Sequence, residues 1–293
     1  MNIEQLRKSR KADFGKIVKE FENTTNKPYQ DDRFWKPERD KAGNATATIR
    51  FLNAGPDDEL PWVKIFSHGF QGPSGRWYIE NSLTTLGKPD PVAEYNVALW
   101  NSTSDDNSPE RKRVRDQKRK LSYISNVLVV SDPKHPENNG KVFLYKYGKK
   151  IFDKIMDKAR PTFEDEEPVN VFDFWEGANF KLRLKTVERF PNYDSSEFES
   201  PTPIADSDEE ILEIANKMYR LGEFLEESNF KTYEELKNRL NMVLGEQSAP
   251  SPMSYEEEKE PTPMPVVEAS TPRSVIDDDD TDMIAYFKEL AEN

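Results

Sequence analysis

Residues 123–130 read YISNVLVV and residues 141–147 read KVFLYKY. The first segment is almost continuously apolar and rich in β-branched side chains, which is typical of a buried strand. In the second segment, the period of two places Phe143, Tyr145 and Tyr147 on one face of a strand. Together the two segments predict the centre of a β-rich core.

Further short strands are predicted around this pair. Residues 62–67 and 76–80 resemble strands joined by a glycine-rich turn, and residues 180–185 alternate between apolar and basic side chains. Residues 45–51 alternate strictly, which directs Arg50 outward and the apolar side chains inward. Short strands with long irregular loops predict a small barrel of the OB type, in a mainly β chain with flanking helices, that is, of the α+β class.

Helices and distinct terminal segments flank this core. Two capping-box spacings, Ser207 with Glu210 and Thr232 with Glu235, predict helix starts ahead of apolar residues at helical spacing. The proline-, serine- and glutamate-rich composition from residue 246 onward predicts a disordered linker and an acidic C-terminal tail. We therefore divide the chain into a basic arm, a core and a tail, at residues 1–20, 21–245 and 246–293.

Charge is distributed unevenly along the chain. The formal net charge of the 293 residues is −13. Residues 250–293 contain twelve acidic and three basic residues, a net charge of −9, whereas residues 110–160 contain fifteen basic and six acidic residues, a net charge of +9. A basic surface and an acidic tail are separate features, so an acidic total does not exclude nucleic acid as a partner.

The basic region opens with the run RKRVRDQKRK at residues 111–120, in which seven residues are Lys or Arg and one is acidic. Such a run by itself is compatible with a solvated, flexible surface loop. Strands rich in Tyr, Phe and Lys follow it directly, however, and cations beside rings are typical of proteins that bind unpaired bases. No obvious recognition helix is found, which favours single strands over duplex.

Residues suited to catalysis or metal binding are scarce. The chain has no Cys and two His, which excludes disulfides and thiolate metal sites. There is no glycine-rich phosphate loop, and the carboxylates fall in linkers, helix starts and the tail, so we expect no enzyme. The absence of a secretion signal or a membrane-length apolar run predicts a cytoplasmic protein.

The tail ends in a segment suited to docking on a partner. Large apolar residues at helical spacing follow a run of aspartates, and a tail required only for solubility has no use for them. The predicted partner-binding residues are Asp277, Asp278, Asp279, Asp280, Met283, Ile284, Phe287 and Leu290.

A set of short segments stands in order through residues 44–245. They are ATIRFL at 47–52, HGF at 68–70, WYIE at 77–80, KRK at 118–120 with SY at 122–123, NVLVV at 126–130, PENNGKVF at 136–143, YGKKI at 147–151, WEGANF at 175–180 and NYD at 192–194. This ordered set resembles the single-stranded-DNA-binding, or helix-destabilising, proteins of T-even-like bacteriophages.

The resemblance implies an OB-type core with a cleft for single-stranded DNA, flanked by a basic arm and an acidic tail. Rings implied to contact bases are Tyr123, Tyr145, Phe190 and Tyr193, with Trp100 near a further family tyrosine position. Phosphates would be faced by Arg50, Lys118, Arg119, Lys120 and Lys146, to which the basic run adds Arg111 and Lys112.

The resemblance also implies contacts with proteins. The arm residues Arg7, Lys8, Ser9 and Arg10 look like the family motif that docks onto a neighbouring subunit, which gives head-to-tail, cooperative coverage of the strand. The tail would bind phage polymerase, recombination and helicase-loading proteins, and would compete with DNA for the basic cleft.

One departure from the family concerns a metal. Its well-known members hold a structural zinc with one His and three Cys, in a subdomain that corresponds here to about residues 62–100. His68 occupies the His position, but the thiol positions fall at or near Ser82, Asp90 and Ala93. We therefore expect the zinc site to be lost and no cofactor to be bound.

On these grounds the sequence predicts a non-enzymatic protein that coats single-stranded DNA in phage replication, recombination and repair. Binding would be cooperative and sequence-tolerant, with helix destabilisation and recruitment of replication proteins through the tail, in the cytoplasm of the infected host. Two alternatives remain at this stage: a regulator that binds single-stranded RNA, and a scaffold whose core binds protein.

Overall fold

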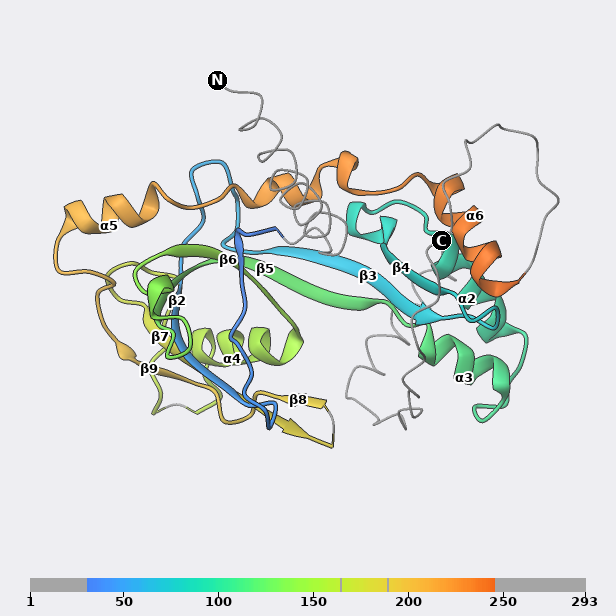
Figure 1. Cartoon of the computed structure of the whole chain (residues 1–293), viewed down its shortest axis with the longest axis horizontal. Helices are drawn as coiled ribbons and strands as arrows, with labels where there is room; N and C mark the ends of the chain where they lie inside the picture. Colours follow the sequence, from blue (N-terminus) through green and yellow to red (C-terminus); the bar gives the residue numbers. More distant parts are fainter. Residues whose placement is uncertain (1–30, 164, 189, 246–293) are drawn as a thin grey trace, which may run out of the picture. The chain divides into compact units, whose positions relative to one another are not determined.

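The segment YISNVLVV lies within a long strand, β5 (Lys120–Ser131), in the computed structural model, which describes residues 31–163, 165–188 and 190–245 (Figure 1). The chain divides into two units. Among the described residues, unit one combines residues 31–65 with 121–226, and unit two combines residues 66–120 with 227–245. The strands β3 (Val63–Gln71) and β5 carry the chain across these boundaries.

Unit one is built on a mixed sheet whose strands follow the order β1-β6-β5-β2-β7-β8, with β9 also paired to β7. The bounds are β1 Phe34–Trp35, β2 Ala45–Phe51, β6 Val142–Tyr147, β7 Ala178–Val187, β8 Phe190–Asn192 and β9 Glu197–Pro201. β1 and β6 are parallel, and the other pairs are antiparallel. The described strands form an open order rather than the closed small barrel that the sequence predicts, so the OB-type topology stays a prediction.

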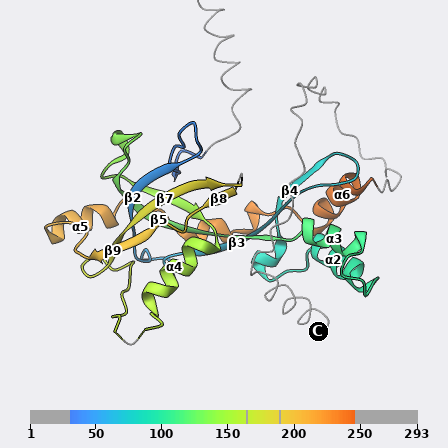
Figure 2. The ribbon, with the colours of Figure 1, turned by 90° about the horizontal axis from the view of Figure 1, so that it is seen from below.

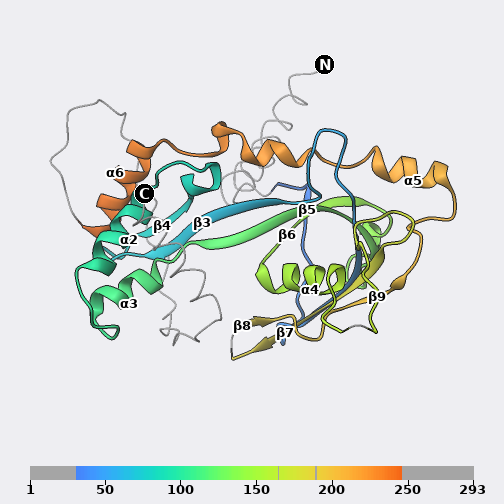
Figure 3. The ribbon, with the colours of Figure 1, turned by 180° about the vertical axis from the view of Figure 1, so that it is seen from behind.

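The main core of unit one lies on the sheet face that carries Phe51, Tyr145 and Phe180. These side chains are 0%, 4% and 0% exposed. The helix α4 (Lys149–Ala159) lies beside the strands of unit one (Figures 2 and 3). Its side chains Ile151 and Ile155, which lie one turn apart, belong to this core. The basic and aromatic residues at 141–151 do not predict a helix, so α4 is missed from the sequence. The signal that could have found it is the pair of isoleucines four residues apart.

Arg50 departs from the alternation expected on β2. The strand pattern directs its side chain outward, but the side chain is fully buried. Its Nη2 donates hydrogen bonds to the carbonyl oxygens of Asp173 and Thr202, at 2.8 Å each. Gly177 makes room for this group, because a Cβ at that residue would lie 2.8 Å from Nη2. Burial lowers the pKa of Arg50 to about 10, against the opposing influence of Asp173, so the guanidinium stays charged at neutral pH.

The burial of Arg50 has a simple cause. The sequence pattern assumes that one face of β2 is open to solvent. In the structure, a second apolar cluster contains Leu52, next to the end of β2, with Leu128, Phe174 and Ile204. Both faces of the sheet are therefore covered near the end of β2, and a polar side chain there must find its partners inside the protein.

Unit two contains an antiparallel hairpin of β3 and β4 (Trp77–Asn81). Phe70 on β3 is paired with Tyr78 on β4, and their rings stack with centres 5.2 Å apart. The hairpin lies beside α2 (Pro91–Asn101) and α6 (Tyr233–Leu244) (Figure 1). Its face with Phe70 and Tyr78 packs against apolar residues of these helices, including Val92 and Leu240.

Helix starts follow local capping chemistry. α6 begins with the full capping box expected at Thr232 and Glu235. α5 (Asp208–Ala215) begins at Ser207 as expected, although the Glu210 carboxylate accepts from the Asp206 N–H instead of completing a box. The other elements are α3 (Pro109–Asp116), η1 (Leu83–Leu86), η2 (Pro136–Asn138), η3 (Leu221–Leu225) and η4 (Glu227–Asn229). None of the described helices is long and apolar enough to cross a membrane.

Candidate nucleic-acid interface

The basic run at residues 111–120 begins as a helix rather than a flexible loop. α3 starts after Ser108, whose hydroxyl accepts a hydrogen bond from the third helical N–H, and Pro109 is its first residue. A serine followed by a proline is a helix-start signal that the sequence offers but that the run of charges obscures. Lys112 is exposed on this helix, where it can meet a phosphate.

Arg111 is held by the protein itself. Its guanidinium lies 4.1 Å from the centre of the Trp100 ring, pairs with Asp106 and donates to the Thr103 carbonyl oxygen at 2.8 Å. The structure therefore brings two predicted contact residues, Arg111 and Trp100, together as a cation–π pair. In this arrangement each covers part of the surface that the other would offer to DNA.

Lys118, Arg119 and Lys120 lead from α3 into β5. Lys118 is half-buried. Arg119 is also half-buried, because its guanidinium lies 4.0 Å from the centre of the Phe66 ring and donates to the Thr84 hydroxyl at 3.0 Å. Lys120 is exposed and is the most accessible cation of the three.

In unit one, Tyr123 and Tyr145 belong to a row of stacked rings inside the core. Neighbouring ring centres are 5.6 Å apart from Tyr145 to Tyr147, 5.7 Å from Tyr147 to Tyr123, and 4.0 Å from Tyr123 to Phe152 of α4. Tyr123 and Tyr145 are each 4% exposed, and burial raises the pKa of Tyr145 well above its usual value. The family resemblance implies that these two rings contact bases. In the structure they are not accessible to bases, because α4 and the sheet enclose them.

Phe190, Tyr193 and Lys146 are more accessible members of unit one. The Phe190 ring on β8 is 45% exposed, and Tyr193 is half-buried at the edge of the same core cluster. Lys146 is exposed on β6, although protein atoms around its ammonium lower its pKa by desolvation. Of the rings predicted in unit one, Phe190 and Tyr193 are thus the ones a base can reach directly.

The positions that the resemblance assigns to zinc ligands come together in unit two. Ser82 Oγ donates to Asp90 Oδ2 at 2.9 Å, and the Ala93 N–H donates to Asp90 Oδ1 at 3.1 Å. His68 Nε2 lies 3.5 Å from Asp90 Oδ1, while its Nδ1 lies 3.1 Å from the Gln117 carbonyl oxygen. Burial raises the pKa of Asp90, but hydrogen bonds from His68, Ser82 and the backbone outweigh it and hold the pKa below the usual value.

These residues do not fit a zinc site. Ala93 has no side-chain donor atom, and the Ser82 hydroxyl is already bonded to the carboxylate. In the part of the chain that the structure describes, no group of three His, Cys, Asp or Glu side chains is placed to hold a metal. The carboxylate instead accepts from the N–H groups of Leu83 and Val92, at 3.0 Å each, and so joins η1 to the start of α2. We call His68, Ser82 and Asp90 the Asp90 cluster.

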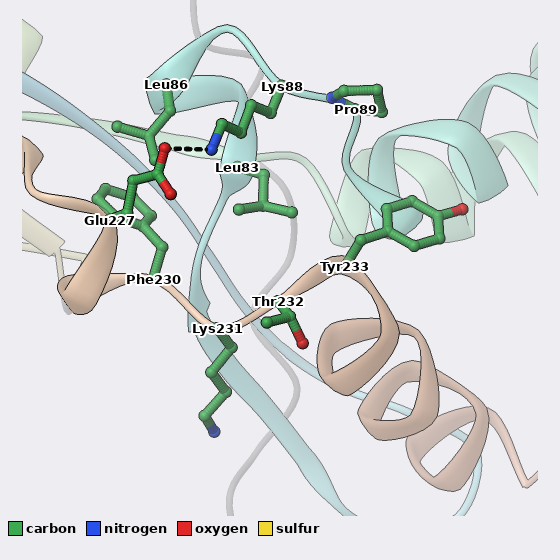
Figure 4. A pocket seen from close by; sticks show the side chains of 9 residues that line it. All are labelled: Leu83, Leu86, Lys88, Pro89, Glu227, Phe230, Lys231, Thr232 and Tyr233. Atoms are coloured by element: carbon green, nitrogen blue, oxygen red, sulfur yellow. Dashed lines mark hydrogen bonds and ion pairs between the residues drawn. The ribbon is translucent and has the colours of Figure 1, made fainter.

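A surface pocket of about 410 Å³ also lies in unit two (Figure 4). Its lining is mainly apolar and includes Leu83 and Phe230. Its two cations are already paired: Lys88 with Glu227 at 2.6 Å, and Lys231 with Glu80 at 2.6 Å, which leaves no unpaired charge for a phosphate. The pocket therefore adds nothing to a nucleic-acid interface.

The remaining predicted site residues lie outside the described part of the chain. They are the self-association residues Arg7, Lys8, Ser9 and Arg10, and the partner-binding residues between Asp277 and Leu290. Their roles stay predictions.

Comparison with known proteins identifies relatives of this chain. A family model described as "gp32 DNA binding protein like" matches residues 43–244. The chain is 42% identical over 221 residues to a single-stranded DNA-binding protein of Enterobacteria phage T2, covering 74% of this chain and 71% of that protein. It is 41% identical over 221 residues to that of Enterobacteria phage T4, with the same coverage. A single-stranded DNA-binding protein of Enterobacteria phage RB70 is 38% identical over 96 residues, which cover 32% of this chain and 77% of that protein.

Because the family model covers well over half of the chain, and relatives above 40% identity share most of their length with it, the chain belongs to the gp32-like family of DNA-binding proteins.

Proposed function

We propose that this protein coats single-stranded DNA cooperatively and with little sequence preference. Membership of the family makes it a DNA-binding protein and not an enzyme, and the relatives from phages T2 and T4 are single-stranded DNA-binding proteins. The family match carries the proposal, because it runs through residues 43–244 and so includes the basic run and the paired strands β5 and β6.

Exposed cations supply the electrostatic part of binding. Lys112 and Lys120 of unit two and Lys146 of unit one are exposed in a protein with a net charge of −13. Phosphates that pair with these ammonium groups release counterions, which makes the affinity fall steeply with salt. This term is independent of base sequence, in keeping with a coating function.

Stacking supplies the second part of binding. In unit one we assign it to Phe190 and Tyr193, whose rings are accessible, at roughly 1–3 kcal/mol for each ring that stacks on a base. Tyr123 and Tyr145 do not stack on bases; they are core residues that stabilise the sheet. Arg50 likewise acts inside the protein, through its bonds to two carbonyl groups.

We also propose roles for the segments outside the described residues. The basic arm at residues 1–20 mediates head-to-tail association along DNA, and the acidic tail recruits phage polymerase, recombination and helicase-loading proteins. The protein then acts in replication, recombination and repair in the cytoplasm of the infected bacterium, in keeping with relatives that are phage proteins. A ligand that binds only the single strand also destabilises duplex by mass action.

Fluorescence titration of the full chain, which has five tryptophans, tests the proposal. Homopolymer single strands of DNA, matched RNA and matched duplex are compared at several salt concentrations. We expect the tightest binding to single-stranded DNA, with no strong dependence on base identity. Tighter binding to RNA would favour the RNA-binding alternative, and no binding to any strand would favour a protein scaffold.

We further propose that unit two folds without zinc. The Asp90 cluster supports this proposal, because the Asp90 carboxylate accepts hydrogen bonds from the Ser82 hydroxyl and from backbone N–H groups, and Ala93 has no side-chain donor atom for a metal. Metal analysis of the purified protein tests it, and stoichiometric zinc would contradict it.

A further inference from the structure

The outer face of the β3–β4 hairpin in unit two has no role in the function proposed so far. The inner face carries Phe70 and Tyr78, which are 4% and 0% exposed. Because strand side chains alternate, the paired residues Gly69 and Ile79, and Trp77 two residues along, belong to the outer face. There Trp77 is 53% exposed and Ile79 is 67% exposed. Two large apolar side chains on this face of the hairpin are thus left open to solvent by the described residues.

A cation lies over the same face. Gly69 has no side chain, and a Cβ at this residue would lie 3.8 Å from Nζ of Lys120. The Lys120 ammonium therefore sits above the backbone of β3, next to the position of Ile79 on β4. Trp77 is two residues farther along β4, which corresponds to roughly 7 Å in a strand. A ring, an aliphatic side chain and an exposed ammonium are neighbours on one open surface.

The backbone beneath the ring is fixed. Arg239 of α6 donates from Nη2 to the Trp77 carbonyl oxygen at 3.2 Å. The inner face of β4 is anchored by the stack of Tyr78 on Phe70. The Trp77 ring is therefore presented from a held strand, which reduces the ordering cost of binding a ligand on it.

We propose that Trp77, Ile79, Gly69 and Lys120 form an additional contact surface for single-stranded DNA, which we call the hairpin face. A base stacks on the indole, and a phosphate of the same strand pairs with the Lys120 ammonium. Single-stranded DNA fits better than a protein partner, because the face joins a flat ring to a cation and carries no acidic side chain at these four positions. The inference rests on the single-strand binding proposed above.

The test uses the full chain and a short oligothymidylate of about 10 nucleotides, within the roughly 4–16 nucleotides that one single-strand-binding fold covers. Trp77→Ala is compared with Trp175→Ala, a matched control in unit one whose side chain is 52% exposed. Circular dichroism and thermal unfolding establish that both variants keep the fold. Trp77→Phe serves as the conservative variant, since it keeps a flat ring.

Trp77→Ala should weaken binding of the short strand by about 5- to 150-fold, while Trp77→Phe should recover most of it. Trp175→Ala should bind as the parent chain does, and the DNA-induced fluorescence quench should shrink in Trp77→Phe. An unchanged affinity of Trp77→Ala for the short strand would overturn the proposal. So would a loss seen only on long strands, which would assign the face to contacts between copies of the chain. Failure of the parent chain to bind any strand would instead refute the proposed function.

Discussion

Unit one and unit two use aromatic residues in opposite ways. In unit one, a row of rings from Tyr145 to Phe152 is enclosed between the sheet and α4. In unit two, the described residues cover one face of the hairpin, and Trp77 is exposed on the other. The comparison teaches that a strand pattern shows which side chains share a face, but that an element from elsewhere in the chain decides whether this face is buried.

The largest expected effect is the loss of stability when one of the enclosed rings of unit one is removed. Tyr145→Ala removes a ring that is 4% exposed, so we expect the free energy of unfolding to fall by about 3–5 kcal/mol, the range for large buried aromatic side chains. Urea unfolding followed by circular dichroism measures this. Phe190→Ala is the control, because its ring is 45% exposed and should change stability little. Equal stability of the two variants would mean that the Tyr145 ring is not a core element.

The next effect concerns how each unit compensates a buried charge. Arg50 of unit one donates from Nη2 to two carbonyl oxygens, whereas Asp90 of unit two accepts hydrogen bonds from four donors and faces His68. Asp90→Ala removes the acceptor of the Ser82 hydroxyl and of three backbone N–H groups, together with the carboxylate that faces His68. We expect the free energy of unfolding to fall by several kcal/mol, because each buried donor left without a partner costs roughly 1–3 kcal/mol.

The matched control for that variant is Asp116→Ala, an exposed aspartate of the same unit, which should have little effect. Thermal unfolding of the parent chain should also be the same with and without EDTA. A fall in the melting temperature on adding the chelator would show that a metal, rather than the Asp90 cluster, holds this part of unit two.

Much of the fold could be predicted from local patterns. The alternation at residues 45–51 and the apolar run at 123–130 correspond to β2 and β5, and the capping signals at Ser207 and Thr232 correspond to α5 and α6. These succeed because each signal lies within the element it predicts. α2 and α3 carry comparable signals, an aspartate or serine before a proline, which the surrounding turn residues and charges mask.

The accessibility of the site residues could not be predicted in this way. Arg50 and Tyr145 both stand on strands with suitable chemistry, and both are buried by segments distant in the sequence. Arg111 belongs to a run of cations, but its charge is satisfied by Asp106 and the Trp100 ring. Burial and ion pairing depend on tertiary contacts. The residue type therefore indicates which residues could bind DNA, but not which of them are accessible to it.

A smaller effect, on affinity alone, separates accessible rings from enclosed ones. Phe190→Ala should weaken binding of single-stranded DNA by about 1–3 kcal/mol while leaving unfolding nearly unchanged, because the ring contacts solvent rather than the core. Fluorescence titration at fixed salt measures the affinity. Unchanged affinity would remove Phe190 from the interface and leave Tyr193 as the accessible predicted ring of unit one.

The smallest expected effect separates the two kinds of cation in unit two. Lys120 is exposed, so Lys120→Gln should reduce the slope of log affinity against log salt by about 0.7, the contribution of one phosphate contact on a single strand. Arg111→Gln should change the slope less, because its guanidinium is already bound to Asp106 and the Trp100 ring. Equal changes in the two variants would show that Arg111 leaves Trp100 when DNA binds. The freed ring would then become a second stacking group in unit two, and the contrast between the units would lie in how firmly each holds its rings.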